Sequence, residues 1–174
     1  MNELDEAWAL ALAEAERRAR ERGRGDVADY LALRMANDQL RAVGVDWLLT
    51  AFTTLIGEIN RAGAAIQSAR TEPHRFAVGR STMVGTLLVF RYGVRALTIE
   101  AGWPRTPRDG IVRGGGLACA RISHFGDRKA GDELLLVPQA EGAPQWLTLG
   151  PDGTRAPFTR ERFRYHLSRF LQQT

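Results

Sequence analysis

The stretch that decides the fold runs from residue 75 to residue 101 and reads RFAVGRSTMVGTLLVFRYGVRALTIEA. Its apolar runs are short, contain many β-branched and aromatic residues, and are broken by glycines such as Gly93, a pattern typical of strands joined by tight turns. Strands this close in sequence, with no helix between them, pair antiparallel. The stretch predicts the start of an antiparallel meander, with strands at 75–78, 82–92 and 94–101.

The same pattern of short apolar runs broken by turn residues continues toward the C-terminus. Further strands are predicted at 117–125, 133–137 and 146–149. Turns are predicted at Gly126-Asp127 and at Pro151-Asp152-Gly153. Residues 71–158 are therefore expected to form a sheet of about six strands. Thr159 can then cap a last helix, 159–172, whose apolar residues recur at helical spacing.

The first 70 residues are predicted to form three helices. Gly23 and Gly25 end the first helix, and Gly44 suits the C-terminal stop of the second. The third helix begins near Asp46 and should lie against the sheet, because its apolar residues form one continuous stripe. The residues of that stripe are Leu48, Phe52, Leu55, Ile56, Ile59 and Ile66.

The first helix ends in a strongly charged run, EAERRARERGR, from Glu14 to Arg24. Opposite charges four residues apart share one side of a helix and attract each other. The run therefore predicts a solvated helix face with pairs such as Glu14–Arg18 and Glu16–Arg20.

These elements predict an α+β fold: about three N-terminal helices, an antiparallel meander of about six strands, and one C-terminal helix. A chain of 174 residues without a long polar linker suits one domain, 1–174, in which residues 1–70 are helical, residues 71–158 form the sheet and residues 159–172 form the last helix. An alternative is that the N-terminal helices form an arm through which the chain makes a homodimer.

Charge and cysteine content indicate the cellular compartment of the protein and the kinds of partner that it can bind. The net charge is +4, and it is divided between −2 over residues 1–70 and +6 over residues 71–174. Nearly all the basic residues are arginine, which coding bias alone can produce, so sequence-independent nucleic-acid binding is a minority reading. The single cysteine, Cys119, fits a reducing compartment. The apolar runs are too short for a membrane span, and we expect a cytoplasmic protein with no membrane partner.

The longest connection between predicted strands, Trp103–Gly116, reads WPRTPRDGIVRGGG. Its 14 residues exceed the usual length of about 4 to 6, and loops of this length are either functional or disordered. Arginine forks beside exposed glycine backbone can bind phosphate or carboxylate. The alternative is a flexible surface loop. The candidates for binding an anion or partner are Arg105, Arg108, Arg113, Gly114, Gly115 and Gly116.

A second set of candidates flanks this loop: Glu100, Trp103, Arg121 and His124. Glu100 and Arg121 are predicted to form a cross-strand pair, although Glu100 could instead act as a general base in a pocket covered by the loop. His124 lies five residues after Cys119, so strand alternation places the two side chains on opposite faces and excludes a nucleophile–base dyad.

Familiar motifs are missing from the sequence. The glycines of the loop lack the third glycine of a dinucleotide fingerprint, and no phosphate-binding P-loop occurs. The histidines are scattered, and no metal-ligand spacing is found. We therefore expect no cofactor and no metal. The leading hypothesis is a non-catalytic binding or interaction module that engages an anionic partner through residues 103–116. The alternative is a small-ligand protein or enzyme with a pocket between sheet and helix under that loop.

Overall fold

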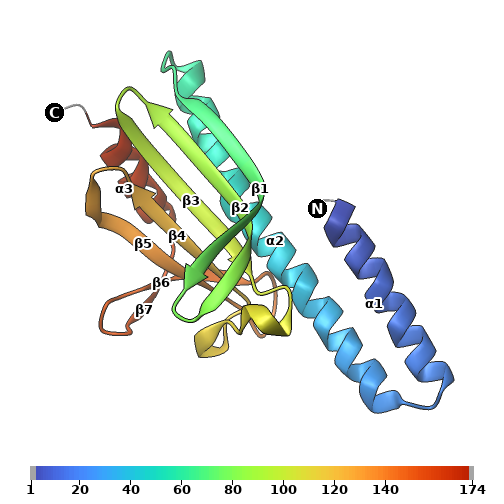
Figure 1. Ribbon diagram of the computed structural model, residues 1–174. Coiled ribbons are helices and arrows are strands. Elements are labelled where there is room, and N and C mark those ends of the chain that lie inside the picture. Colours follow the sequence, from blue (N-terminus) through green and yellow to red (C-terminus); the bar gives the residue numbers. More distant parts are fainter. Residues whose placement is uncertain (1–2, 173–174) are drawn as a thin grey trace. The chain divides into compact units, whose positions relative to one another are not determined.

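The computed structural model describes residues 3–172 and confirms the α+β class. Figure 1 shows its helices and strands in chain order. The helices are α1 (Glu3–Glu21), α2 (Gly25–Arg61) and α3 (Arg160–Leu171). The strands are β1 (Gln67–Val78), β2 (Ser81–Tyr92), β3 (Arg95–Trp103), β4 (Ala118–His124), β5 (Asp127–Val137), β6 (Gln145–Leu149) and β7 (Arg155–Pro157). The chain divides into two compact units, Met1–Val43 and Gly44–Thr174, which are described separately.

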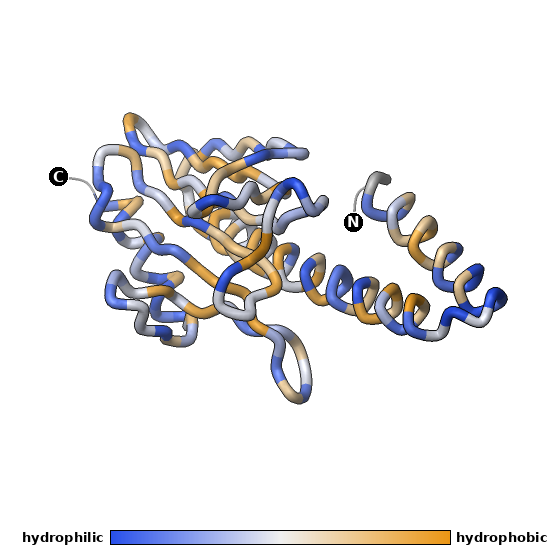
Figure 2. The backbone as a smooth tube through the Cα atoms, turned by 60° about the horizontal axis from the view of Figure 1, so that its bottom comes forward, coloured by the Kyte–Doolittle hydropathy of each residue, from blue (hydrophilic) through white to orange (hydrophobic). Residues whose placement is uncertain are grey.

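The first unit is a helical hairpin of α1 and the beginning of α2. Arg34 of α2 lies over the ring of Trp8, 5.2 Å from its centroid, and Arg20 pairs with Asp29 at 3.6 Å. Both helices carry hydrophilic and hydrophobic stretches (Figure 2). Only three hydrophobic side chains described in this unit are buried, namely Leu12, Ala19 and Ala28. The hairpin is therefore thinly packed.

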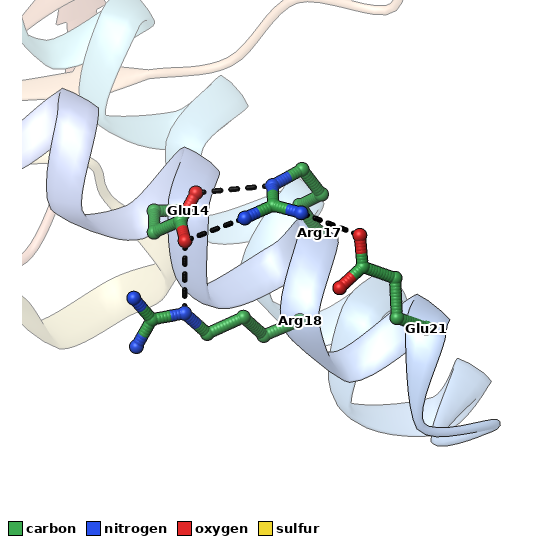
Figure 3. Close-up of polar contacts among 4 residues, drawn as sticks. All are labelled: Glu14, Arg17, Arg18 and Glu21. Atoms are coloured by element: carbon green, nitrogen blue, oxygen red, sulfur yellow. Dashed lines mark hydrogen bonds and ion pairs between the residues drawn. The ribbon is translucent and has the colours of Figure 1, made fainter.

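The charged run of α1 forms the predicted solvated face. Figure 3 shows Glu14 accepting hydrogen bonds from Arg17 and Arg18, while Arg17 also reaches Glu21. The predicted Glu14–Arg18 and Glu16–Arg20 pairs are confirmed, at 2.8 and 3.0 Å. Because these side chains are exposed to solvent, such pairs contribute little to the stability of the fold.

The expected helix stop at Gly44 is wrong, because α2 runs without a break from Gly25 to Arg61. The structure shows what this glycine does instead. A Cβ atom at residue 44 would lie 2.5 Å from Cδ2 of Leu136, which is fully buried in the sheet. Gly44 therefore allows helix and sheet to approach closely, and residues 3–61 form two helices rather than the three expected.

By length and composition, α2 is a helix that could cross a membrane, a test that core helices of soluble proteins also pass. Its second half is a core helix in this structure. Leu48, Leu49, Phe52 and Ile56 are buried there.

The second unit is built on an antiparallel sheet in which the strands follow chain order, β1 to β7. The predicted meander is confirmed, with seven strands rather than about six. The first strand begins before the expected position, and β7 has only three residues and so shows no alternation in the sequence. The predicted turns at Gly93, Gly126 and Gly153 are present, each glycine having a positive φ.

One face of the sheet packs against the second half of α2 and against α3. The ring of Phe163 on α3 contacts those of Phe52 and Phe158, and its centroid lies 4.7 Å from the centroid of Phe52 and 4.6 Å from that of Phe158. On the same face, Nε1 of Trp146 donates a hydrogen bond to the carbonyl of Gly44 at 2.8 Å. This face holds the main core.

The other face carries a smaller core around Cys119. The buried members are Phe76, Met83, Cys119 and Leu135, and Val112 of the long loop packs against them. His124, by contrast, bonds to α3 on the main-core face. The predicted placement of Cys119 and His124 on opposite faces is confirmed.

Candidate functional site

The loop between β3 and β4 is folded into two short 3-10 turns, Pro107–Asp109 and Arg113–Gly115. The buried carboxylate of Asp109 holds the first turn, accepting hydrogen bonds from the Thr106 backbone, the Thr106 hydroxyl and the Arg75 guanidinium. Burial opposes ionisation of this group, but these bonds hold the pKa of Asp109 below its ordinary value. The Ser81 hydroxyl donates to the carbonyl of Ile111 and accepts from its amide. The loop is therefore anchored to the sheet.

The glycines of this loop serve close packing. A Cβ at Gly110 would lie 2.5 Å from the Ser81 hydroxyl oxygen, and one at Gly116 would overlap the side chain of Leu135. Gly114 has a positive φ, and its carbonyl accepts a hydrogen bond from Arg155 at 3.2 Å. Gly115 also has a positive φ, but open space surrounds it. Packing and turn geometry account for these glycines without a ligand.

The three loop arginines are placed differently from one another. Arg105 stacks on the ring of Trp103, 3.8 Å from its centroid, and donates to the carbonyl of Val84. Arg108 and Arg113 are exposed at the surface of the two turns. The structure thus fixes one arginine against the sheet and presents two to solvent.

The pocket candidates fall into separate places. Glu100 and Arg121 are register partners on β3 and β4, and the predicted pair is present with 3.3 Å between Arg121 Nη1 and Glu100 Oε2. His74 joins them, with its Nε2 2.8 Å from Glu100 Oε1. These three half-buried side chains share the face that carries Cys119.

His124 lies elsewhere. It pairs with Leu97 near the beginning of β3, whereas Trp103 ends that strand six residues later. At about 3.3 Å per residue, this places Trp103 and the loop about 20 Å from His124. Glu100, Trp103, Arg121 and His124 therefore do not line one pocket.

A buried chain of polar side chains begins at His124. Its Nε2 lies 2.9 Å from Nδ1 of His166 on α3, and Nε2 of His166 lies 2.9 Å from Oδ2 of Asp132 on β5. Arg162, one turn before His166, donates two hydrogen bonds to the same carboxylate. His166 is fully buried and His124 is 9% exposed. We call these four side chains, Arg162, Asp132, His166 and His124, the histidine relay.

With both imidazoles uncharged, the hydrogen bonds allow one arrangement of protons in the relay. Burial of Asp132 raises its pKa, but the bonds from Arg162 and His166 outweigh burial and hold that pKa well below its usual range. The ionised carboxylate only accepts, so Nε2 of His166 must donate to it. In neutral His166, Nδ1 is then an acceptor, and Nε2 of His124 must donate to it. Nδ1 of His124 is left with a free lone pair.

The relay ends at a pocket between α3 and the β4–β5 turn. The pocket has a volume of about 390 Å³ and is lined by Arg95, Ala96, His124, Phe125, Gly126, Asp127, Arg169, Phe170 and Gln172. Arg169 is held by the carboxylate of Asp127, at 3.0 Å from its Nε. The pocket thus combines two guanidinium groups, one carboxylate, one imidazole and two aromatic rings.

Burial and, to a lesser extent, the neighbouring His166 lower the pKa of His124 to about 4, although Asp127 and Asp132 act in the opposite direction. At neutral pH the imidazole is uncharged and can accept a proton or a hydrogen bond from a ligand. Among the described residues, no group of three or more His, Cys, Asp or Glu side chains is placed to hold a metal ion.

Sequence reasoning found His124 but missed its partners. Asp132, Arg162 and His166 belong to β5 and α3, 8 to 42 residues away along the chain. One signal was available: His166 stands among Phe163, Leu167 and Phe170 on the apolar side of a helix, where a buried histidine needs a partner.

Comparisons with protein-family models, with curated proteins and with solved structures find no match for this chain. The chemistry of the site is therefore the basis for a functional proposal.

Proposed function

We propose that this protein binds a small organic anion in the pocket beside His124. The observation that carries the proposal is a buried chain of hydrogen bonds that ends at His124, which lines a pocket together with Arg95 and Arg169. Nδ1 of His124 has no hydrogen-bond partner among the described residues and can accept one from a ligand. Buried polar networks are costly to build, and a merely structural network has no need to end in a pocket. This reading corresponds to the small-ligand alternative, without the loop as its lid.

The chemistry of the lining indicates the class of ligand. Guanidinium groups are suited to carboxylates, with which they form paired hydrogen bonds. Phe125, which is 77% exposed, offers apolar surface beside the charges, and a volume of about 390 Å³ falls within the range of small-molecule sites. A small carboxylate with an apolar body satisfies these features, and benzoate is a suitable probe.

The test is a titration with benzoate, followed by amide NMR shifts, with neutral benzamide as the matched compound. Benzoate should shift the amides of Ala96, Gly126 and Phe170, and benzamide should not. Arg169→Gln should weaken benzoate binding at least about tenfold, because it removes a charge-assisted contact and leaves Asp127 to repel the anion. Arg164→Gln, an exposed arginine on the same helix, is the control. Equal binding of benzoate and benzamide, or shifts confined to another region of the chain, would contradict the proposal.

A second candidate is binding of an anionic partner by loop 103–116, which is favoured by one observation. The loop is anchored through Asp109 and Ser81 while Arg108 and Arg113 stay exposed, so the backbone that carries these two charges is already ordered before a partner binds. Arg105 is occupied by Trp103 and drops out of this candidate set.

Arg108→Glu combined with Arg113→Glu tests the loop. Retention of the protein on a polyglutamate resin should be lost in this variant and kept in the matched Arg160→Glu, Arg164→Glu variant, both with nearly unchanged melting temperature. Retention of mixed-sequence DNA is measured in parallel, because steep salt dependence there would favour nucleic acid instead. Equal retention of both variants on polyglutamate would exclude the loop.

A further inference from the structure

We propose that the pocket takes up a proton together with its anion, and that this proton enters the histidine relay at Nδ1 of His124. The inference rests on the proposed function, since it describes how the same pocket binds its ligand.

Nδ1 of His124 is accessible from outside the protein. The ring makes its hydrogen bond through Nε2, to His166. Within residues 3–172, every fully buried side-chain nitrogen or oxygen has a hydrogen-bond partner. Nδ1 of His124 has none among them, so it is in contact with the outside, and the outside next to His124 is the pocket.

The proton then has a path through the relay. A proton added to Nδ1 of His124 allows the proton on its Nε2 to pass to Nδ1 of His166, 2.9 Å away. His166 then carries a proton on each nitrogen and becomes an imidazolium. Its Nε2 proton remains bonded to Asp132, so the new positive charge lies next to a carboxylate held in its ionised form by Arg162. The relay gains one positive charge, and no other bond changes.

Proton uptake requires an anion in the pocket. The charged groups facing His124 from the surrounding elements are Arg95 on β3, Asp127 and Asp132 on β5, and Arg162, His166 and Arg169 on α3. Asp127 is already paired with Arg169, and Asp132 with Arg162. Protonation of the buried imidazole is therefore unfavourable by itself, and an anion in the pocket supplies the missing counter-charge.

Linkage makes the effect measurable. Where the complex holds a proton that the free protein does not, affinity for the anion rises up to tenfold for each unit by which pH falls. A network that only fixes α3 to the sheet would give an affinity independent of pH in this range.

The experiment is calorimetric titration of the full chain with benzoate at pH 6.0 in MES and in Bis-Tris. The difference in apparent enthalpy between buffers of different ionisation enthalpy gives the number of protons taken up. We expect more than half a proton per benzoate in the wild type and in the Arg164→Gln control. His124→Gln, whose amide can still donate to His166, should take up none.

The outcomes separate the two proposals. Absence of benzoate binding between pH 5 and 7 overturns the proposed function and this inference with it. Binding with no proton uptake overturns the inference alone, and uptake that persists in His124→Gln overturns the assignment to His124. If that variant does not fold, the ring-nitrogen NMR shifts of wild-type His124 and His166 decide: they must move toward protonated values on addition of benzoate, and unchanged shifts overturn the inference.

Discussion

His124 shows at the scale of one residue how position changes the chemistry of a side chain. The imidazole lies at the edge of the main core, where burial and the neighbouring His166 lower its pKa well below the pKa of a free histidine. In the protein without ligand, the lowered pKa of His124 makes the folded state sensitive to acid. It also gives the protein a neutral proton acceptor at physiological pH.

We predict that the free energy of unfolding falls between pH 6.5 and pH 4. The pKa of His124 is lowered from 6.5 to about 4 on folding, so in this window the unfolded chain binds a proton that the folded chain does not. The contribution is complete above pH 6.5 and decreases as pH falls toward 4, by roughly 3 kcal/mol in total. Urea unfolding at half-unit pH steps measures it. His124→Gln should flatten the curve, and parallel curves for variant and wild type would contradict the assignment.

Glu100 and Cys119 show how much of the site can be read from residues alone. Strand alternation predicted that Cys119 and His124 lie on opposite faces of the sheet, and this is confirmed. The position of Glu100 and Arg121 on either side of one loop predicted their pairing, and this is also confirmed. Alternation depends only on neighbouring residues, so it predicts the face of a side chain correctly wherever the strand is regular. The meeting of Asp132 with His166 depends on how α3 docks on the sheet, and no local pattern contains that information.

At the scale of the element, α2 depends on a glycine that weakens it as a helix. The same residue type can end a helix or allow close packing, and sequence alone does not distinguish these roles. Here Leu136, on a strand 92 residues later, decides between them.

Gly44→Ala should therefore destabilise the protein by about 1 to 3 kcal/mol, because the added methyl group overlaps the fully buried side chain of Leu136. Gly57→Ala, in the same helix, meets only the flexible end of Arg61 at 3.6 Å and should stabilise by up to about 1 kcal/mol. Chemical denaturation of both variants gives the comparison. Stabilisation by both alanines would show that helix propensity, not packing, governs residue 44.

The anchored loop gives a second prediction at this scale. Cys119 lies in the smaller core, against which Val112 of the loop packs, and burial, with Glu133 adding to it, raises the pKa of its thiol to about 11. Native protein should react slowly with a disulfide reagent at pH 8, because reaction requires an exposed thiolate. Ser81→Ala removes both bonds to Ile111 and should speed the reaction several-fold. Ser68→Ala, on exposed β1, is the control, and equal rates would mean that the loop does not limit access.

At the scale of the whole molecule, one helix belongs to two units of different packing. Buried apolar residues are frequent along α2 beyond Gly44 and sparse before it. Local stability follows buried contacts, so the two ends of a continuous helix need not open together.

Hydrogen exchange should show this directly. We expect amides of 45–58 to exchange at least about tenfold more slowly than those of 26–42, although both segments have the same helical hydrogen bonds. Mass spectrometry of peptic peptides resolves the two segments, and α3 serves as an internal reference for the second unit. Uniform protection along α2 would instead indicate that the first unit is stabilised by something else, and self-association through the N-terminal helices would then be the first explanation to test.

The order of the sheet, in which each strand pairs only with its neighbours in sequence, leaves β1 and β7 as open edges. Open edges invite pairing with another molecule. β7 offers only three residues, one of them Pro157, and β1 carries Arg70, Glu72 and Arg75, with its pairing interrupted between Thr71 and His74. Charge, proline and an irregular register all hinder a further strand from adding. We therefore expect both edges to resist the addition of strands from other copies of the chain, which is the step by which sheets grow into fibrils.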